Sequence, residues 1–239
     1  MSTDWTKNST RTPNKIAFDK ELFASIPQVM ISDAPKAFVT LVGNAEGLLD
    51  HINQAKGLGY NETEIIVVEN QKKVYEALER EKLALGVKCL IEFDDIVNVV
   101  EKLPRNTILG WDFDGCAPIS TEWFSILKLY ASFENPHFFN ITADPRLGRR
   151  PSDYKCIGEI LHLPKVRRQV YFNDVDPKDG KFKVQKTMDA YPSDNKCFHL
   201  LGRHCGIEFE TRCYDSKPTS GKSKMKYKKM MSYCAVGKC

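Results

Sequence analysis

The sequence lacks any long hydrophobic run. Its apolar segments are far shorter than the roughly 20 residues of a membrane-spanning helix, and the first residues contain no apolar stretch like that of a signal peptide. There is no internal repeat and no low-complexity segment, which excludes solenoid and fibrous architectures. Since 42% of the residues are hydrophobic and 28% are charged, the composition is that of a globular chain, and we expect a cytoplasmic protein.

Disulfide and metal-binding patterns are also missing. The chain has eight cysteines among 239 residues, but they are scattered, and a chain of this length buries enough core to fold without disulfides. We therefore expect reduced thiols. Cysteines and histidines lie close together once, but their spacing is not that of a zinc finger, so we expect no metal site. These residues are Cys197, His199, His204, Cys205 and Cys213.

The charge is nearly balanced, and a formal net charge of +4 is too small to require a polyanionic partner. Its distribution is uneven, because no acidic residue follows Asp215 and basic clusters occur before it. Such clusters permit contact with nucleic-acid phosphates, and they also fit a solvated basic face. The residues expected to contact nucleic acid are Arg149, Arg150, Arg167 and Arg168.

Hydrophobic patterning predicts five strands that alternate with helices. The strands are short apolar runs, and the segments between them have apolar residues at helical spacing. This alternation indicates a parallel sheet with helices on both faces. The expected strands span residues 37–42, 64–69, 87–93, 107–111 and 137–141.

The remainder of the chain has a different pattern. Residues 145–195 are rich in charge, proline and aspartate, so we interpret them as an insertion with a short helix and a hairpin near 177–180. After an expected helix at 196–203, two strand-like runs at 207–214 and 225–233 flank a loop. The expected fold is α/β, a doubly wound and mostly parallel seven-stranded sheet closed by a C-terminal antiparallel hairpin. The expected domain boundaries are 1–30 for an N-terminal extension and 31–239 for one domain that contains the insertion.

A glycine-containing turn follows the first expected strand. Gly43 and Gly47 let a ligand approach the backbone, and the helix that follows them favours a negative group at its start. The spacing is G-x-x-x-G rather than the G-x-G-x-x-G of dinucleotide-binding proteins, and the Lys-Ser/Thr of a phosphate-binding loop is missing. A tight turn with a purely structural role would have the same pattern. The candidate binding residues of this turn are Gly43, Asn44, Glu46 and Gly47.

Acidic residues end the second and third strands. Glu69, followed by Asn70, could accept hydrogen bonds from both hydroxyls of a ribose, or it could simply begin a helix. Asp94 and Asp95 could cap a helix or accept a hydrogen bond from an adenine amino group, and the two roles can coexist.

Two further carboxylates, Asp112 and Asp114, end the fourth strand at the centre of the expected sheet. Desolvating carboxylates at such a position is costly, which favours a functional role. One of them could orient a nucleophile or take its proton. The neighbouring Cys116 has no setting that indicates a covalent mechanism.

Taken in order, these motifs resemble those of the class I S-adenosylmethionine-dependent methyltransferases. The turn VGNAEG, the strand end IIVVEN, the acids of IEFDDI and the motif WDFDG follow one another as in that family, and IEFETRCYDS and KMKYKKMMSYCA resemble its last two strands. The resemblance implies S-adenosylmethionine as cofactor and methyl transfer by in-line displacement. The residues that it assigns to the cofactor are Gly43, Asn44, Glu46, Gly47, Glu69, Asn70, Asp94, Asp95 and Asp112, with Asp112 and Asp114 as the catalytic pair.

The expected acceptor is a nucleic acid, with RNA favoured. The segments WDFDGCAPI and NITAD resemble motifs of tRNA guanine exocyclic-amine dimethyltransferases, although Gly115 stands where those enzymes have proline. Two alternatives remain. One is an NAD-linked oxidoreductase, which the glycine spacing disfavours. The other is a methyltransferase-like module that binds the cofactor or regulates without catalysis, which the departure at Gly115 keeps open.

Overall fold

The structure is a computed structural model. Within the residues that it describes, no helix is long and apolar enough to cross a membrane. The cysteines whose side chains are described, Cys89, Cys205, Cys213 and Cys234, are free thiols. For β6, β7 and the ends of a few other elements the backbone alone is described. The described residues are 13–29, 32–117, 122–143, 166–175, 182–190, 195–216 and 228–237.

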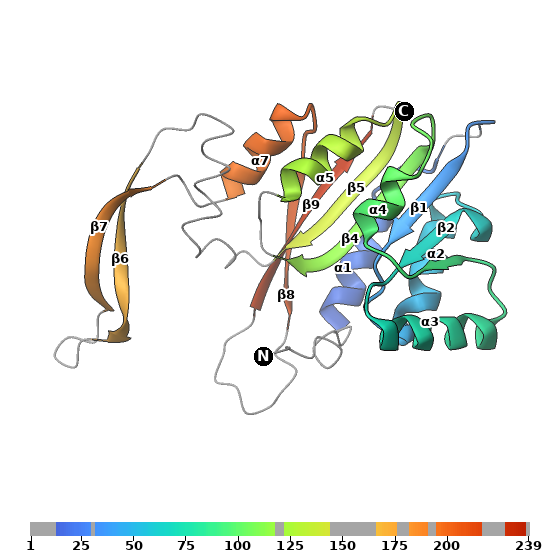
Figure 1. Cartoon of the computed structure of the whole chain (residues 1–239), viewed down its shortest axis with the longest axis horizontal. Coiled ribbons are helices and arrows are strands. Elements are labelled where there is room, and N and C mark those ends of the chain that lie inside the picture. Colours follow the sequence, from blue (N-terminus) through green and yellow to red (C-terminus); the bar gives the residue numbers. More distant parts are fainter. Residues whose placement is uncertain are drawn as a thin grey trace.

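Seven strands form one sheet in the order β3-β2-β1-β4-β5-β9-β8 (Figure 1). Strands β1 to β5 pair in parallel, whereas β9 pairs antiparallel with both β5 and β8. The strands are β1 (Lys36–Thr40), β2 (Ile65–Val68), β3 (Leu90–Glu92), β4 (Ile108–Ala117), β5 (Asn135–Ala143), β8 (Glu210–Ser216) and β9 (Lys228–Val236).

Helices cover both faces of this sheet, as Figure 1 shows for α4, α5 and α7 on the near face. A hydrophobic core lies on each face of the sheet, between the strands and the helices that cover that face. Successive residues along a strand belong to different cores. Phe38 packs in the core under α1, α2 and α3, while its neighbour Val39 packs in the core under α4, α5 and α7. The helices are α1 (Pro13–Ala24), α2 (Leu48–Gly57), α3 (Lys72–Leu85), α4 (Ile96–Glu101), α5 (Glu122–Ala131) and α7 (Asn195–His204), with short 3-10 turns η2 (Ala45–Gly47) and η3 (Glu62–Glu64).

Helix α1 belongs to the same packed unit as the sheet. Its apolar side chains Phe18, Leu22 and Phe23 are buried in the core with Phe38 and Phe138. The Phe23 ring meets the Phe138 ring edge-on, with centroids 6.0 Å apart. Part of the segment expected as an N-terminal extension therefore covers one face of the sheet.

These observations confirm the expected α/β architecture and its C-terminal antiparallel hairpin. The expected end of the fourth strand is wrong: the sequence predicts that it ends at Trp111, but β4 continues through Asp112 to Ala117. Its pairing with β1 ends at Asp112, whereas its pairing with β5 reaches Ala117, with an irregular register after Phe113. Pairing with β5 thus overrides the turn propensity of the sequence DFDG.

The insertion contains a second, two-stranded antiparallel sheet, formed by β6 (Val166–Val175) and β7 (Phe182–Ala190). Figure 1 shows this hairpin standing apart from the seven-stranded sheet. It fits the hairpin expected near residues 177–180, although its turn lies outside the described residues, as does the short helix expected in the insertion.

Candidate functional site

The sheet has a topological switch point between β1 and β4. After β1 the chain passes to α2 on one face, whereas after β4 it passes to α5 on the other face. Such a divergence opens a crevice outside the carboxyl ends of the two strands, where α/β proteins bind ligands. The candidate site is therefore built from residues at the carboxyl ends of β1, β2, β3 and β4.

The predicted glycine turn links β1 to α2. Gly43 has a φ of 72°, a left-handed conformation that glycine adopts without strain. Asn44 caps the following turn, because its side-chain oxygen accepts a hydrogen bond from the Gly47 N–H at 3.0 Å. Glu46 is exposed and Gly47 is buried. The N–H of Gly47 is thus satisfied within the chain, and the binding roles of these four residues remain predictions.

Glu69 lies directly after β2 and is 7% exposed. Its backbone N–H donates to the Glu92 carbonyl of β3 at 3.0 Å, which holds the ends of β2 and β3 together. Its carboxylate accepts from the Gln71 N–H at 2.7 Å. Burial raises the pKa of this carboxyl above its ordinary value, and hydrogen bonds from the Gln71 and Asn70 backbones partly offset that effect. Asn70 itself is exposed.

Asp94 and Asp95 have separate roles at the end of β3. Asp95 caps α4, since its carboxylate accepts from the Val97 N–H at 2.9 Å. Asp94 accepts hydrogen bonds from Lys102 Nζ and Asn98 Nδ2, and these contacts, Lys102 first, lower the pKa of Asp94 to about 2. The helix-cap reading therefore applies to Asp95, and the predicted adenine contact of either acid stays a prediction.

An aromatic pair made of the exposed Phe93 and the half-buried Tyr75 lies near the end of β3 and was not predicted from the sequence. Phe93 follows Glu92 at the end of β3 and is 53% exposed, and its ring lies 5.3 Å from that of Tyr75 on α3. Large exposed aromatic side chains beside a strand end often contact a ligand. The sequence signal for it is the aromatic residue that precedes the two acids in IEFDD.

The predicted catalytic residue Asp112 lies in a buried polar row. It is 2% exposed, and its register partners on the neighbouring strands are Thr40 of β1 and Asn140 of β5. Asn140 Nδ2 donates to Asp112 Oδ1 at 2.7 Å, and Thr40 Oγ1 donates to Asp112 Oδ2 at 3.3 Å. Ser232 of β9 extends the row, since its hydroxyl donates to Asn140 Oδ1 at 2.5 Å.

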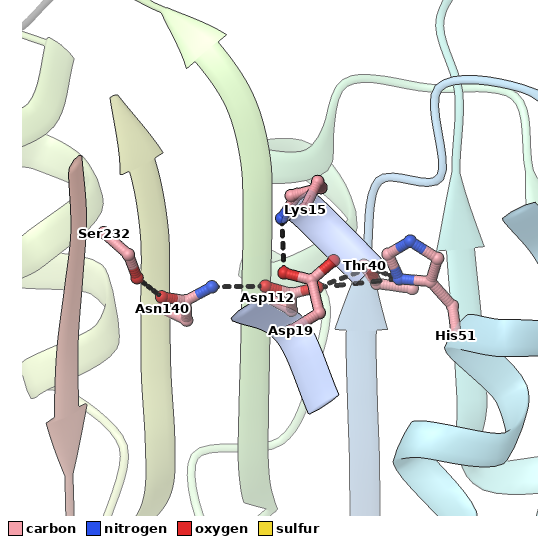
Figure 2. A network of polar contacts seen from close by, with 7 residues as sticks. All are labelled: Lys15, Asp19, Thr40, His51, Asp112, Asn140 and Ser232. Carbon is pink, nitrogen blue, oxygen red and sulfur yellow. Dashed lines mark hydrogen bonds and ion pairs between the residues drawn. The ribbon is translucent and has the colours of Figure 1, made fainter. Parts of the chain in front are cut away.

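Helices α1 and α2 complete this row. His51 of α2 is buried, with Nδ1 3.2 Å from Thr40 Oγ1 and 3.6 Å from Asp112 Oδ2. Figure 2 shows α1 in front of the row, with Lys15 and Asp19 joined by an ion pair of 2.6 Å. Apart from Asp112, these residues were not predicted as site residues, because their proximity depends on strand register rather than on a sequence motif.

The remaining predicted residues are placed only in part. For Asp114 the structure describes the backbone in β4, and for Arg167 and Arg168 the backbone in β6. The other two residues predicted to contact nucleic acid, Arg149 and Arg150, lie outside the described residues.

Among the described residues, no group of three or more His, Cys, Asp or Glu side chains could hold a metal ion. Within the cysteine and histidine cluster, the described contact of His199 is with a hydroxyl, Nε2 to Thr211 Oγ1 at 2.6 Å.

The placement of β9 decides the fold type. In a dinucleotide-binding sheet of order 3-2-1-4-5-6 every strand is parallel, whereas here the last strand of the chain is antiparallel and lies between β5 and β8. That arrangement is the one implied by the sequence resemblance. The chain has the class I methyltransferase fold.

Comparisons with known proteins were made by sequence and by structure. No protein-family model matches the chain, and no curated protein matches it. Solved structures do match. An S-adenosylmethionine-dependent methyltransferase from Clostridium acetobutylicum ATCC 824 is 11% identical, with a TM-score of 0.42, and the match covers 98% of this chain and 92% of that one.

Two further matches are of the same kind. Magnesium protoporphyrin IX methyltransferase from Synechocystis PCC 6803, solved with bound SAH, is 11% identical with a TM-score of 0.46, covering 93% of this chain and 83% of that one. The PH0226 protein from Pyrococcus horikoshii OT3 is 12% identical with a TM-score of 0.47, and the match covers 99% of this chain and 94% of that one. At these identities the comparisons describe likeness of fold.

Proposed function

We propose that the protein is an S-adenosylmethionine-dependent methyltransferase. The observation that carries the proposal is the buried carboxylate of Glu69 at the end of β2, beside the switch point of this sheet. Among the residues that the structure describes, no lysine or arginine forms an ion pair with it. A carboxylate that is buried without a cation fits a partner with neutral donors, such as the two hydroxyls of a ribose.

The surrounding residues fit the rest of an adenosine-containing cofactor. Phe93 is exposed next to the strand end that holds Glu69, and it offers an aromatic face on which an adenine ring can pack. The left-handed turn at Gly43 lets the cofactor approach the backbone between β1 and α2. These residues would hold the cofactor at the ends of β1, β2 and β3.

The protein's contribution to the reaction is positioning. When bound, S-adenosylmethionine supplies a methyl group that its sulfonium has already activated. The end of β4 would present Asp114 to the acceptor, where a carboxylate can orient the nucleophile or take its proton. Alignment of acceptor and methyl group then accounts for most of the rate enhancement.

RNA is the acceptor that we propose. The support is the charge of Arg149, Arg150, Arg167 and Arg168 in the insertion, since basic clusters neutralise backbone phosphates. The two that fall in β6 belong to the hairpin that stands apart from the sheet.

Transfer of tritium from methyl-labelled S-adenosylmethionine tests the proposal. The wild type is incubated separately with total RNA, total DNA, a protein extract and a small-molecule extract. We expect label in RNA, and much less label with Glu69→Gln than with Glu76→Gln, an exposed glutamate of α3 that serves as a matched control. Label in another fraction would mean that the acceptor belongs to that fraction and is not RNA. Cofactor binding without transfer to any fraction would support a regulatory module, and binding of NAD instead would support an oxidoreductase.

A further inference from the structure

The polar row across β4 contains a carboxylate, that of Asp112, which is 2% exposed and accepts a hydrogen bond on each of its two oxygens. Asn140 Nδ2 can only donate, so Asp112 Oδ1 accepts there, and Thr40 donates its single hydroxyl hydrogen to Asp112 Oδ2. A donor on each oxygen stabilises the ionised form of a carboxyl group, and we assign that form to Asp112. His51 Nδ1 lies 3.6 Å from Oδ2 and adds a third polar neighbour.

The direction of the hydrogen bonds also determines which ring nitrogen of His51 carries a hydrogen. Because the Thr40 hydroxyl hydrogen points to Asp112, the contact of 3.2 Å between Thr40 Oγ1 and His51 requires Nδ1 to carry the hydrogen. Ser232 in turn donates to Asn140 Oδ1, which orients the amide so that its nitrogen faces Asp112. The hydrogen bonds that join Ser232, Asn140, Thr40 and His51 therefore all run toward the Asp112 carboxylate, along the contacts drawn in Figure 2.

Burying an ionised carboxylate costs several kcal/mol unless donors compensate it. An apolar row would hold three parallel strands together at no such cost, as Phe38 and Phe138 do one level below. The row lies where β4 leaves its regular register, since the pairing of β4 with β5 becomes irregular between Phe113 and Ala117. It thus anchors the last regular residue pairs before the segment that contains Asp114.

We propose that Asp112, Asn140, Ser232, Thr40 and His51 form a positioning network that fixes the end of β4, and that Asp112 itself does not exchange a proton with the acceptor. This inference rests on the proposed methyltransferase function and deepens it. Asp112 is a positioning residue, and the carboxylate left to meet the acceptor is that of Asp114. Displacement of a reacting group by about 1 Å can lower a rate about 100-fold, so the network controls turnover more than cofactor affinity.

Exchanging the carboxylate and the amide between β4 and β5 distinguishes a positioning role of Asp112 from a direct role in the reaction. In the double variant Asp112→Asn/Asn140→Asp, the new amide on β4 can donate to the new carboxylate on β5 and still accept from Thr40. The carboxylate on β5 can still accept from Ser232. Every hydrogen bond of the row is thereby kept while the charge moves to the neighbouring strand.

Each variant is measured by thermal denaturation, by calorimetric titration with S-adenosylmethionine, and by transfer of labelled methyl to the fraction that the wild type labels. We expect Asp112→Asn to keep the cofactor dissociation constant within a few fold while turnover falls about 100-fold. Asn140→Asp places two carboxylates together and should lower the melting temperature. The swap should restore both melting temperature and turnover. Thr107→Val, which removes a buried hydroxyl from the residue just before β4, serves as a control.

Two results would overturn the inference. A swap variant that regains the melting temperature but not turnover would show that the Asp112 carboxylate takes part in the chemistry. An Asp112→Asn variant that is folded and fully active would show that the row only stabilises the sheet. Failure of the wild type to bind S-adenosylmethionine is a different outcome, because it would remove the proposed function and with it this inference.

Discussion

Asp112 and Asn140 face each other as register partners on β4 and β5, and the amide of Asn140 donates to the buried carboxylate at 2.7 Å. The contact joins two central strands at the end of the sheet where the cofactor is proposed to bind. Neither residue is more than 2% exposed, so water cannot replace either partner if the other is removed.

Removing the amide should therefore be costly. In Asn140→Ala the carboxylate loses the donor that lies 2.7 Å from Oδ1, and we expect the free energy of unfolding to fall by about 3 kcal/mol. Thr142→Val is the control on the same strand, because the buried Thr142 hydroxyl has no hydrogen-bond partner among the residues that the structure describes, and its removal should be neutral or slightly stabilising. Urea denaturation of both variants at pH 7 measures the difference. Equal stability of the two variants would contradict the ionised state assigned to Asp112.

Glu69 should lower the stability of the free protein. Burial raises its pKa in the folded state, so the folded protein binds more protons than the unfolded chain, and stability falls as pH rises above about 4.5. Glu69→Gln keeps the acceptor for the Gln71 N–H and removes the buried charge. We expect a higher melting temperature than the wild type at pH 7, with Glu76→Gln unchanged. A lower melting temperature would mean that the charge has a stabilising partner.

Histidine 137 should make the protein sensitive to mild acid. His137 Nε2 donates to the Pro27 carbonyl at 2.8 Å, so Nδ1 accepts from the Tyr60 hydroxyl, as a neutral ring requires. Burial lowers the pKa of His137, so the unfolded chain binds more protons and stability is lost as pH falls below about 6.5.

The urea midpoints at pH 7.5 and pH 5.5 measure this loss. His137→Gln should be less stable than the wild type at pH 7.5 and should lose less stability on acidification. The pKa of His199 is also lowered, chiefly by burial, so part of the pH dependence should persist in the variant. The same pH dependence in wild type and variant would show that His137 is not the group responsible.

Substitution by alanine should affect the stability of the protein differently at two glycines. A methyl group on Gly110 of β4 would lie 2.6 Å from both Phe138 Cε1 and Tyr60 Oη, so Gly110→Ala should cost about 1–3 kcal/mol of stability through overpacking. A methyl group on Gly57 of α2 would meet nothing within 4 Å, and Gly57→Ala should be neutral or stabilising. Denaturant midpoints compare the two variants. A stable Gly110→Ala protein would contradict the packing of Tyr60 against β4.

Much of the fold follows from the sequence, because its strands are short apolar runs whose ends carry glycines and acids. The alternation of β1 to β5 with helices fixes the parallel sheet, and the two C-terminal runs supply the hairpin. The length of β4 could not be predicted, since DFDG has turn propensity and its pairing with β5 keeps it extended beyond Asp112.

The position of a candidate residue was predictable where it directly follows an apolar strand, as Glu69 follows β2. The polar row was not, because Thr40, Asp112, Asn140 and Ser232 are far apart in the chain and meet only through the register of four strands. His51 belongs to no motif in the sequence, yet the spacing of α2 turns it toward β1. Register is a tertiary property that a single sequence does not encode as a motif.

The central claim is that this sheet binds S-adenosylmethionine through Glu69, and calorimetric titration tests it most directly. We predict saturable binding to the wild type and to Glu76→Gln with the same dissociation constant. Glu69→Gln should bind more weakly by about tenfold or more, since hydrogen bonds to a charged group contribute about 1.5–3 kcal/mol. Binding of NAD but not S-adenosylmethionine, or equal affinity of Glu69→Gln and wild type for S-adenosylmethionine, would contradict the account.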